Sequence, residues 1–120
     1  NVMGVAKAAL ESSVRYLAMD FGLQNIRVNA ISAGPVRTLA GSGVSDARVM
    51  FNYQKQHSPL GRTVTHYEVG GSALYLLSDL ASGVTGEIHF VDSGFSTVSM
   101  PRLDALKTQE ARAQKVIEDV

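Results

Sequence analysis

Apolar side chains recur at helical spacing from residue 2 to residue 21. The stripe consists of Ala6, Leu10, Val14, Leu17 and Phe21. Residues four apart share one face of a helix, so the stripe indicates an amphipathic helix with one buried face. Gly22 follows the stripe, and glycine adopts the left-handed conformation that ends a helix at little cost. We therefore predict a helix over residues 2–21 that ends at Gly22.

Two short segments have the composition of buried strands. Residues 26–32, IRVNAIS, are rich in β-branched side chains and precede the turn formers AGP at 33–35. Residues 87–92, EIHFVD, form the second apolar segment. Because no GxSxG nucleophile elbow surrounds Ser93, we interpret residues 92–94 as a turn that ends this strand. Each segment predicts a strand that leads into a loop.

A second helix is predicted after Thr65. Glu68 stands three residues further on, which is the spacing of a capping box. Apolar residues then recur at helical spacing at Val69, Ala73, Leu76, Leu77 and Leu80. We expect this helix to end near residues 81–83. Residues 38–56, which precede it, contain GSG and then a helix-compatible stretch, and they predict a loop with one or two short helices.

Strands separated by helices of this length are typical of a parallel α/β sheet. Two or three strands do not make a stable doubly wound sheet, so we expect further strands from another part of the protein. Helical periodicity also begins at Asn1 without a preceding cap signal, so we expect an N-terminal part to be missing. Residues 100–120 are rich in charged residues and indicate an exposed tail, partly helical or disordered.

Composition and charge narrow the possible partners. Of the 120 residues, 45% are hydrophobic and 18% charged, as in an ordinary globular domain or part of one. Eleven basic residues balance eleven acidic ones. The chain therefore lacks the basic field that recruits nucleic acid or an anionic membrane, and small molecules or other proteins are expected instead. No membrane span of roughly 18 apolar residues and no signal peptide pattern occurs, so we expect a cytoplasmic protein.

Cysteine is absent, which excludes disulfides, thiolate nucleophiles and zinc knuckles. His57, His66 and His89 form no pair at metal-ligand spacing, so no metal site is predicted. No nucleophile or carboxylate lies at a meaningful spacing from them. We therefore expect the three histidines to be solvated or to cap helices.

Five segments occur in unbroken order within roughly residues 1–98: NVMGVAKAALE, IRVNAISAGPVRT, GRTVT, EVGGSALYLLSDL and GEIHFVDSGF. Together they resemble the enoyl-acyl-carrier-protein reductases, a divergent branch of the short-chain dehydrogenase/reductases. RVNA occurs across that superfamily, whereas ISAGPVRT points to the branch. The resemblance implies a Rossmann-like doubly wound parallel sheet, of which residues 1–99 form the C-terminal half. Residues 39–56 would be a substrate-binding flap, and the family implies a homotetramer.

Lys7 is the candidate catalytic residue. Members of the superfamily carry a tyrosine on the same helix as a lysine, commonly four residues before it, where this chain has Met3. In the enoyl reductase branch the tyrosine lies seven residues before the lysine, which here falls immediately ahead of Asn1. Seven residues rotate by roughly 700°, so both side chains share one face. Taken alone, Lys7 is better explained as a solvated lysine near Glu11, and the catalytic interpretation depends on the helix and on the ISAGPVRT segment that follows it.

The resemblance implies a division of labour within this pair. The phenol would hydrogen-bond the thioester carbonyl of the substrate. Lys7 would bind the nicotinamide ribose hydroxyls and stabilise the developing enolate electrostatically. Hydride from NADH would attack the conjugated carbon.

The loop after the first strand is the candidate cofactor site. Open α/β sheets bind ligands beyond the carboxyl ends of their strands, and Gly34 permits close backbone approach. The resemblance places the carboxamide on the backbone of Val36 and the pyrophosphate on Thr38. The complete cofactor set is Lys7, Gly34, Pro35, Val36, Thr38, Leu39 and Ala40. The alternative is an ordinary turn in which Gly34 supplies flexibility and Pro35 rigidity.

The same resemblance assigns four residues to the acyl chain of the substrate. They are Met3, Val44, Ala47 and Met50. For Met3, simple packing in the first turn of a helix is the alternative.

The leading hypothesis is NADH-dependent reduction of the 2,3 double bond of enoyl thioesters on acyl carrier protein, a step of fatty acid biosynthesis. A second is a carbonyl reductase or alcohol dehydrogenase of the common short-chain type, against which Met3 argues because tyrosine is expected there. A third is a non-catalytic oligomerisation module without the phenol. The residue ahead of Asn1 separates these hypotheses.

Overall fold

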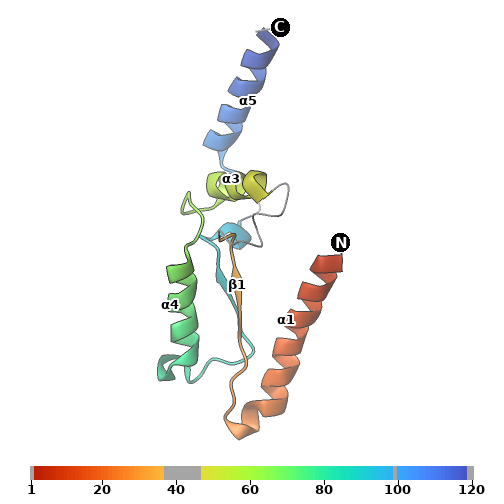
Figure 1. Cartoon of the computed structure of the whole chain (residues 1–120), viewed down its shortest axis with the longest axis vertical. Coiled ribbons are helices and arrows are strands. Elements are labelled where there is room, and N and C mark those ends of the chain that lie inside the picture. The colour runs from red at the N-terminus through yellow and green to blue at the C-terminus, as the bar shows by residue number, and fades with distance from the viewer. Residues whose placement is uncertain (1, 37–46, 99, 119–120) are drawn as a thin grey trace. The chain divides into compact units, whose positions relative to one another are not determined.

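The computed structural model describes residues 2–36, 47–98 and 100–118 (Figure 1). The chain folds into two compact units. The first combines residues 1–33 with 64–91, and the second combines residues 34–63 with 92–120.

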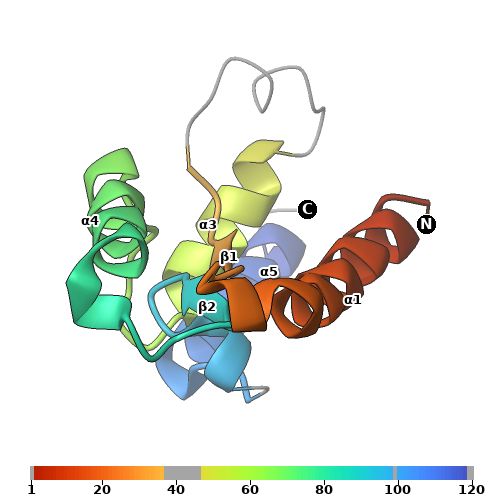
Figure 2. The same cartoon turned by 90° about the horizontal axis from the view of Figure 1, so that it is seen from below.

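The first unit has a helix on either side of a pair of strands. Its helices are α1 (Val2–Phe21) and α4 (His66–Leu77), and its strands are β1 (Ala30–Ala33) and β2 (Ile88–Val91). In Figure 1 and Figure 2, α1 lies on one side of the strands and α4 on the other. Short 3-10 turns, η1 (Gly22–Gln24) and η2 (Asp79–Ala81), follow the two helices. The predicted alternation of helices and strands is confirmed.

The two strands run parallel, as predicted. Ala30 lies opposite Ile88 and Ala33 lies opposite Val91. β1 begins at Ala30 rather than at residue 26, and it includes Ala33, which the sequence analysis assigned to a turn. The predicted boundaries of this strand were therefore wrong at both ends.

Side-chain hydrogen bonds explain why β1 begins late. Val28 N–H donates to Thr85 Oγ1 at 3.1 Å, and Asn29 Nδ2 donates to the Val84 carbonyl at 2.9 Å. Asn29 Oδ1 accepts from Glu87 N–H at 3.0 Å. Residues 28–29 thus contact the segment that leads to β2 largely through side chains, rather than through a regular backbone ladder.

Helix α1 confirms the predicted span, but its end differs from the prediction. Gly22 begins the turn η1, and the left-handed residue is Asn25, with φ 59°. Asn25 N–H donates to the Gly22 carbonyl at 3.0 Å, and Ile26 N–H donates to the Phe21 carbonyl at 3.3 Å. Asparagine tolerates this conformation because its short polar side chain bonds locally. The role predicted for Gly22 therefore belongs to Asn25.

Helix α4 begins with the predicted capping box. Thr65 Oγ1 accepts from Glu68 N–H at 3.2 Å, while Glu68 Oε2 accepts from Thr65 N–H at 2.8 Å. The helix ends at Leu77, earlier than the predicted 81–83, and η2 continues the turn. Ser78 adopts an extended conformation there, which stops the helical ladder.

Arg27 connects the segment before β1 to the end of α4. Its guanidinium donates to the carbonyl of Leu76 at 2.6 Å and to those of Ser78 and Val84 at 3.3 Å. The last carbonyls of a helix have no partner within the helix, so an arginine there satisfies acceptors that would otherwise be unpaired.

The apolar core of the first unit is small. Its buried members are Val14, Ala18, Val64, Leu76 and Ala81. The predicted stripe of α1 is mostly uncovered, because Leu10, Leu17 and Phe21 are exposed. Among the described residues, no helix is long and apolar enough to cross a membrane.

The second unit contains α3 (Ala47–His57), a 3-10 turn η3 (Phe95–Thr97) and α5 (Leu103–Glu118). Helix α3 lies where short helices were predicted, and α5 makes most of the described tail helical. The rest of the predicted flap, up to residue 46, lies outside the described residues. The division into residues 1–99 and a tail of 100–120 stays a prediction.

The capping box generates a prediction about stability. Thr65→Ala removes the acceptor for Glu68 N–H and the partner of its carboxylate, so it should lower the free energy of unfolding by about 1 kcal/mol. Chemical denaturation measures the change. Thr108→Ala is the control, because Thr108 bonds only the Asp104 carbonyl within α5, and alanine is a better helix former. An equal loss in both variants would contradict the stabilising role of the box.

Candidate functional site

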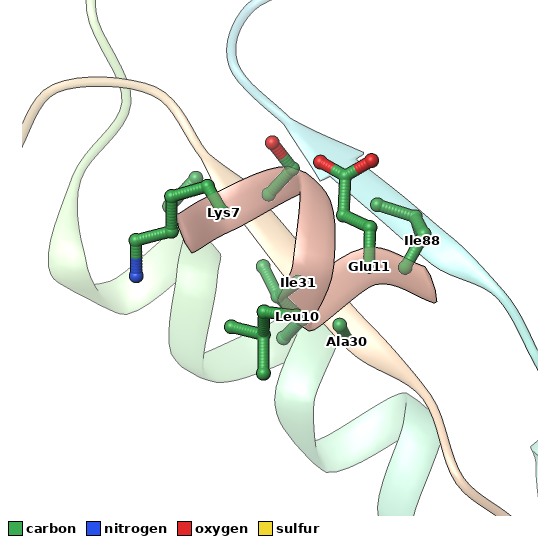
Figure 3. Close-up of a pocket in the computed structure, with 8 residues that line it drawn as sticks. Lys7, Leu10, Glu11, Ala30, Ile31 and Ile88 are labelled. Atoms are coloured by element: carbon green, nitrogen blue, oxygen red, sulfur yellow. The ribbon is translucent and has the colours of Figure 1, made fainter. Parts of the chain in front are cut away.

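Lys7 lies at a cavity of about 340 Å³ in the first unit. Lys7, Leu10 and Glu11 of α1 form one wall, and residues 30–33 of β1 with Ile88 of β2 form the other. Figure 3 shows the Lys7 and Glu11 side chains extending in different directions from the helix. The helix periodicity that predicted α1 therefore also brings Lys7 to the strand pair.

The chemistry of this cavity suits a polar ligand with an apolar body. Leu10, Ile31 and Ile88 supply apolar wall, while Lys7 and Glu11 supply one positive and one negative group. Among the described residues, no ion pair joins Lys7 to Glu11. The Lys7 ammonium, with three donors and no acceptor, can therefore hold hydroxyl or anionic oxygens.

Gly34 is buried directly after β1, and its surroundings leave little room for a side chain. A Cβ at this position would lie 3.0 Å from Asp92 Cα and 3.3 Å from Gln54 Nε2. The strand register explains the first contact, because Ala33 and Val91 are paired and their successors are Gly34 and Asp92. Close contact between these chain segments thus favours glycine here, which the local sequence pattern does not show.

Pro35 and Val36 follow Gly34 and are half-buried. Thr38, Leu39 and Ala40, the remaining loop residues of the predicted cofactor set, lie outside the described residues. The structure thus describes only the first part of the predicted loop.

Asp92 begins the turn after β2, as predicted, and stabilises it with its buried carboxylate. Oδ1 accepts from Gly94 N–H at 2.9 Å, and Oδ2 accepts from Ser96 N–H at 2.8 Å. Ser93 and Gly94 are both left-handed, with φ 61° and 81°. The Ser93 carbonyl accepts from Leu60 N–H at 3.2 Å. An aspartate directly after a strand and two residues before a glycine was the signal for this turn.

Helix α3 buries polar side chains that the sequence analysis did not single out for the core. Gln54 is 8% exposed and His57 is 5% exposed. The rings of Tyr53 and His57 lie 4.3 Å apart between centroids, and Tyr53 also contacts Phe95 edge-on at 6.2 Å. His57 Nδ1 accepts from Arg102 N–H at 3.3 Å, just before α5. Of the two roles expected for His57, solvated or capping, the solvated one is therefore wrong.

The predicted acyl-chain residues are only partly described. Met3 on α1 is 67% exposed and Met50 on α3 is 62% exposed. Ala47 is the first residue of α3, and Val44 lies outside the described residues. The roles predicted for these residues stay predictions. Among the described residues, no group of three acidic or histidine side chains is placed to hold a metal ion.

Comparison with known proteins shows the family to which this chain is similar. The family model described as enoyl-(acyl carrier protein) reductase matches residues 1–96. The chain is 69% identical over 111 residues to enoyl-[acyl-carrier-protein] reductase [NADH] 2 of Rhizobium meliloti strain 1021. That alignment covers 92% of this chain and 41% of the relative. The chain therefore spans about two fifths of the length of the curated relative.

Solved structures share the fold as well as the sequence. FabI from Candidatus Liberibacter asiaticus is 60% identical with a TM-score of 0.80, over 85% of this chain and 40% of that one. The enoyl-acyl-carrier-protein reductase of Anaplasma phagocytophilum, solved in complex with NAD, is 61% identical with a TM-score of 0.81, over 86% and 39%. These likenesses confirm the predicted Rossmann-like α/β class. The chain belongs to the enoyl-(acyl carrier protein) reductase family.

Proposed function

We propose that the protein containing this chain uses NADH to reduce the 2,3 double bond of enoyl thioesters on acyl carrier protein, a step of fatty acid biosynthesis. The observation that carries the proposal is the position of Lys7, on α1 and at a cavity against β1 and β2. A relative with 69% identity bears the name of an NADH enoyl reductase.

We assign the ribose end of the nicotinamide cofactor to the cavity at Lys7. An ammonium group that is free of an ion pair with Glu11 has donors for two neighbouring hydroxyl oxygens. In this role Lys7 orients the cofactor and places positive charge beside the oxygen on which the enolate charge develops. When bound, NADH supplies the hydride for the conjugated carbon. A tyrosine expected immediately ahead of Asn1 would hydrogen-bond the thioester carbonyl.

The loop that begins at Gly34 is the proposed support for the rest of the cofactor. Gly34 keeps the backbone close to Asp92, and Pro35 limits the conformations of the residues that follow. The backbone of Val36 would bond the carboxamide. Thr38 would bond the pyrophosphate, with Leu39 and Ala40 nearby.

The acyl chain of the substrate is assigned to an apolar set consisting of Met3, Val44, Ala47 and Met50. The exposed thioethers of Met3 and Met50 support this assignment, because unbranched apolar side chains adapt to flexible ligands. The substrate arrives on acyl carrier protein, so we also propose a cytoplasmic location.

A homotetramer completes the proposal. Helix α1 exposes Val2, Val5, Tyr16 and Met19 in addition to its partly covered stripe. Apolar surface of this extent is typical of a helix that packs against other chain segments, from the same or a neighbouring subunit.

No observation favours the alternatives. The common short-chain carbonyl reductases have tyrosine where this chain has Met3, and the family match lies with the enoyl reductases. A non-catalytic module is the remaining alternative. It would lack turnover and the tyrosine ahead of Asn1.

Lys7→Ala tests the proposal in the full-length protein. Loss of the ammonium removes both the ribose donors and the charge beside the enolate, so kcat/KM for a short enoyl thioester should fall about 100-fold or more. The assay follows the oxidation of NADH by its absorbance. Lys107→Ala, on α5, is the matched control and should retain wild-type turnover. Unchanged turnover of Lys7→Ala would refute the role of Lys7.

Gly34→Ala tests the loop. The new Cβ would meet Asp92 Cα at 3.0 Å, so backbone must shift, at a cost of about 1–3 kcal/mol in the free energy of unfolding. The KM for NADH should rise with it, because the shifted loop begins the proposed cofactor site. Gly71→Ala on α4 is the control, since its Cβ meets nothing within 4 Å, and it should be neutral or stabilising. If Gly34→Ala matched the wild type in stability and KM, the loop would not have the proposed role.

A further inference from the structure

Residues 101–104 join the C-terminal helix α5 to the end of α3. The backbone N–H of Arg102 donates to His57 Nδ1 at 3.3 Å, and His57 is the last residue of α3. Helix α5 begins at the next residue, and Leu106 N–H donates to the Arg102 carbonyl at 3.2 Å as the first turn forms. One short segment therefore both starts α5 and contacts α3.

Packing within the second unit fixes the ring of His57. The residue is 5% exposed, and its ring centroid lies 4.3 Å from that of Tyr53, one turn earlier on α3. Tyr53 in turn contacts Phe95 edge-on, with 6.2 Å between the ring centroids, and Phe95 begins η3. The nitrogen that accepts from Arg102 therefore belongs to a packed ring, and its position is well defined.

The Arg102 side chain makes two further contacts. Its Nε donates to Asp104 Oδ1 at 3.1 Å and its Nη2 donates to Asp104 Oδ2 at 2.8 Å, a bidentate arrangement that sets the orientation of the guanidinium. These hydrogen bonds lower the pKa of the Asp104 carboxyl below its usual range. Nη1 lies 3.2 Å from the position that a Cβ on Gly61 would occupy. Arg102 therefore also lies against the turn that follows α3.

Beyond this segment the two helices are separated by a cavity of about 440 Å³. Its lining includes Asn52, Lys55 and Gln56 of α3 and Ala105 and Thr108 of α5. The contact between the helices is thus concentrated at residues 101–104. A segment with few contacts opens easily, so the loss of one hydrogen bond there should release the start of α5.

We propose that His57 is a positioning residue, which clasps residues 101–104 to the end of α3 and so holds the helix that is proposed to contact the acyl chain. This inference rests on the proposed function. Met50 and His57 are seven residues apart, or two helical turns, so they lie on one side of α3. Because a helix is a rigid element, a contact at its last residue also restricts the turn that carries Met50. The clasp follows residue 96, where the match to the family model ends.

Two substitutions in the full-length protein test the clasp. Both remove the ring, but His57→Asn places an acceptor oxygen where histidine has Nδ1, whereas His57→Gln places it one bond further from the backbone. Hydrogen exchange of residues 102–106, measured by mass spectrometry, should become about fivefold faster in His57→Gln, because a hydrogen bond that holds the segment is lost. His57→Asn should retain most of the protection. His66→Gln, at an exposed histidine on α4, is the matched control and should leave this exchange unchanged.

Steady-state kinetics test the effect on α3. In His57→Gln the KM for a long-chain enoyl thioester should rise about fivefold, with kcat and the KM for NADH within about twofold of the wild type. His57→Asn should restore the wild-type KM. A protein that ends after Met100 lacks residues 101–104 and should show the same rise. Adding His57→Gln to this shortened protein should cause no further rise, because both changes remove one contact.

The outcomes separate this inference from the proposed function. Equal exchange of residues 102–106 in the wild type and in His57→Gln would overturn the clasp. A further rise in KM when His57→Gln is added to the shortened protein would show that His57 acts only by packing within α3, which also overturns the inference. Should His57→Gln fail to fold, the shortened protein alone carries the test, and an unchanged KM would contradict the clasp. If the wild type reduces no enoyl thioester, the proposed function fails, while hydrogen exchange still decides whether the clasp exists.

Discussion

The parallel pairing of β1 with β2 is the constraint on which the rest of the structure depends. Its register ends both strands together, with Ala33 opposite Val91. The next residues, Gly34 and Asp92, are then so close that a side chain at the first position would require the backbone at Asp92 to shift. The same strands provide one wall of the Lys7 cavity, and α1 provides the other. The same two strands therefore lead into the Gly34 loop, which is proposed to hold the cofactor, and form one wall of the Lys7 cavity.

Polar side chains hold the chain at both ends of this pairing. Before the strands, Arg27, Asn29 and Thr85 bind backbone groups of neighbouring segments. After the strands, Asp92 binds the amides of its own turn. Hydrogen bonds of this kind contribute about 1 kcal/mol each, more where a charged group takes part. Such bonds help to keep the ends of the two strands in place.

The sequence predicted those elements whose pattern repeats along the chain or includes a specific pair of residues. The stripe of α1 spans five apolar positions, and the Thr65 and Glu68 pair is a specific cap, so both helices began where expected. The late start of β1 could not be predicted, because Thr85 and Asn29 form their bonds between segments far apart in the chain. The tight packing at Gly34 could not be predicted either, because it comes from contact with Asp92, which is far away in the sequence.

The sequence also did not predict which polar residues are buried. Periodicity identifies apolar faces, so Gln54 and His57 were not distinguished from the exposed polar residues of the same helix. The ribose-binding role proposed for Lys7 came from resemblance to a family, since a lysine on a helix has no local signature of function. Its position at the cavity is what the structure adds, together with the absence of an ion pair to Glu11 among the described residues.

A crystal structure of the full-length protein with bound NAD tests the central claim most directly. The account predicts Lys7 Nζ within hydrogen-bond distance, about 2.7–3.2 Å, of a nicotinamide ribose hydroxyl. A structure in which NAD is bound, Lys7 points into solvent and another side chain holds the ribose would contradict it.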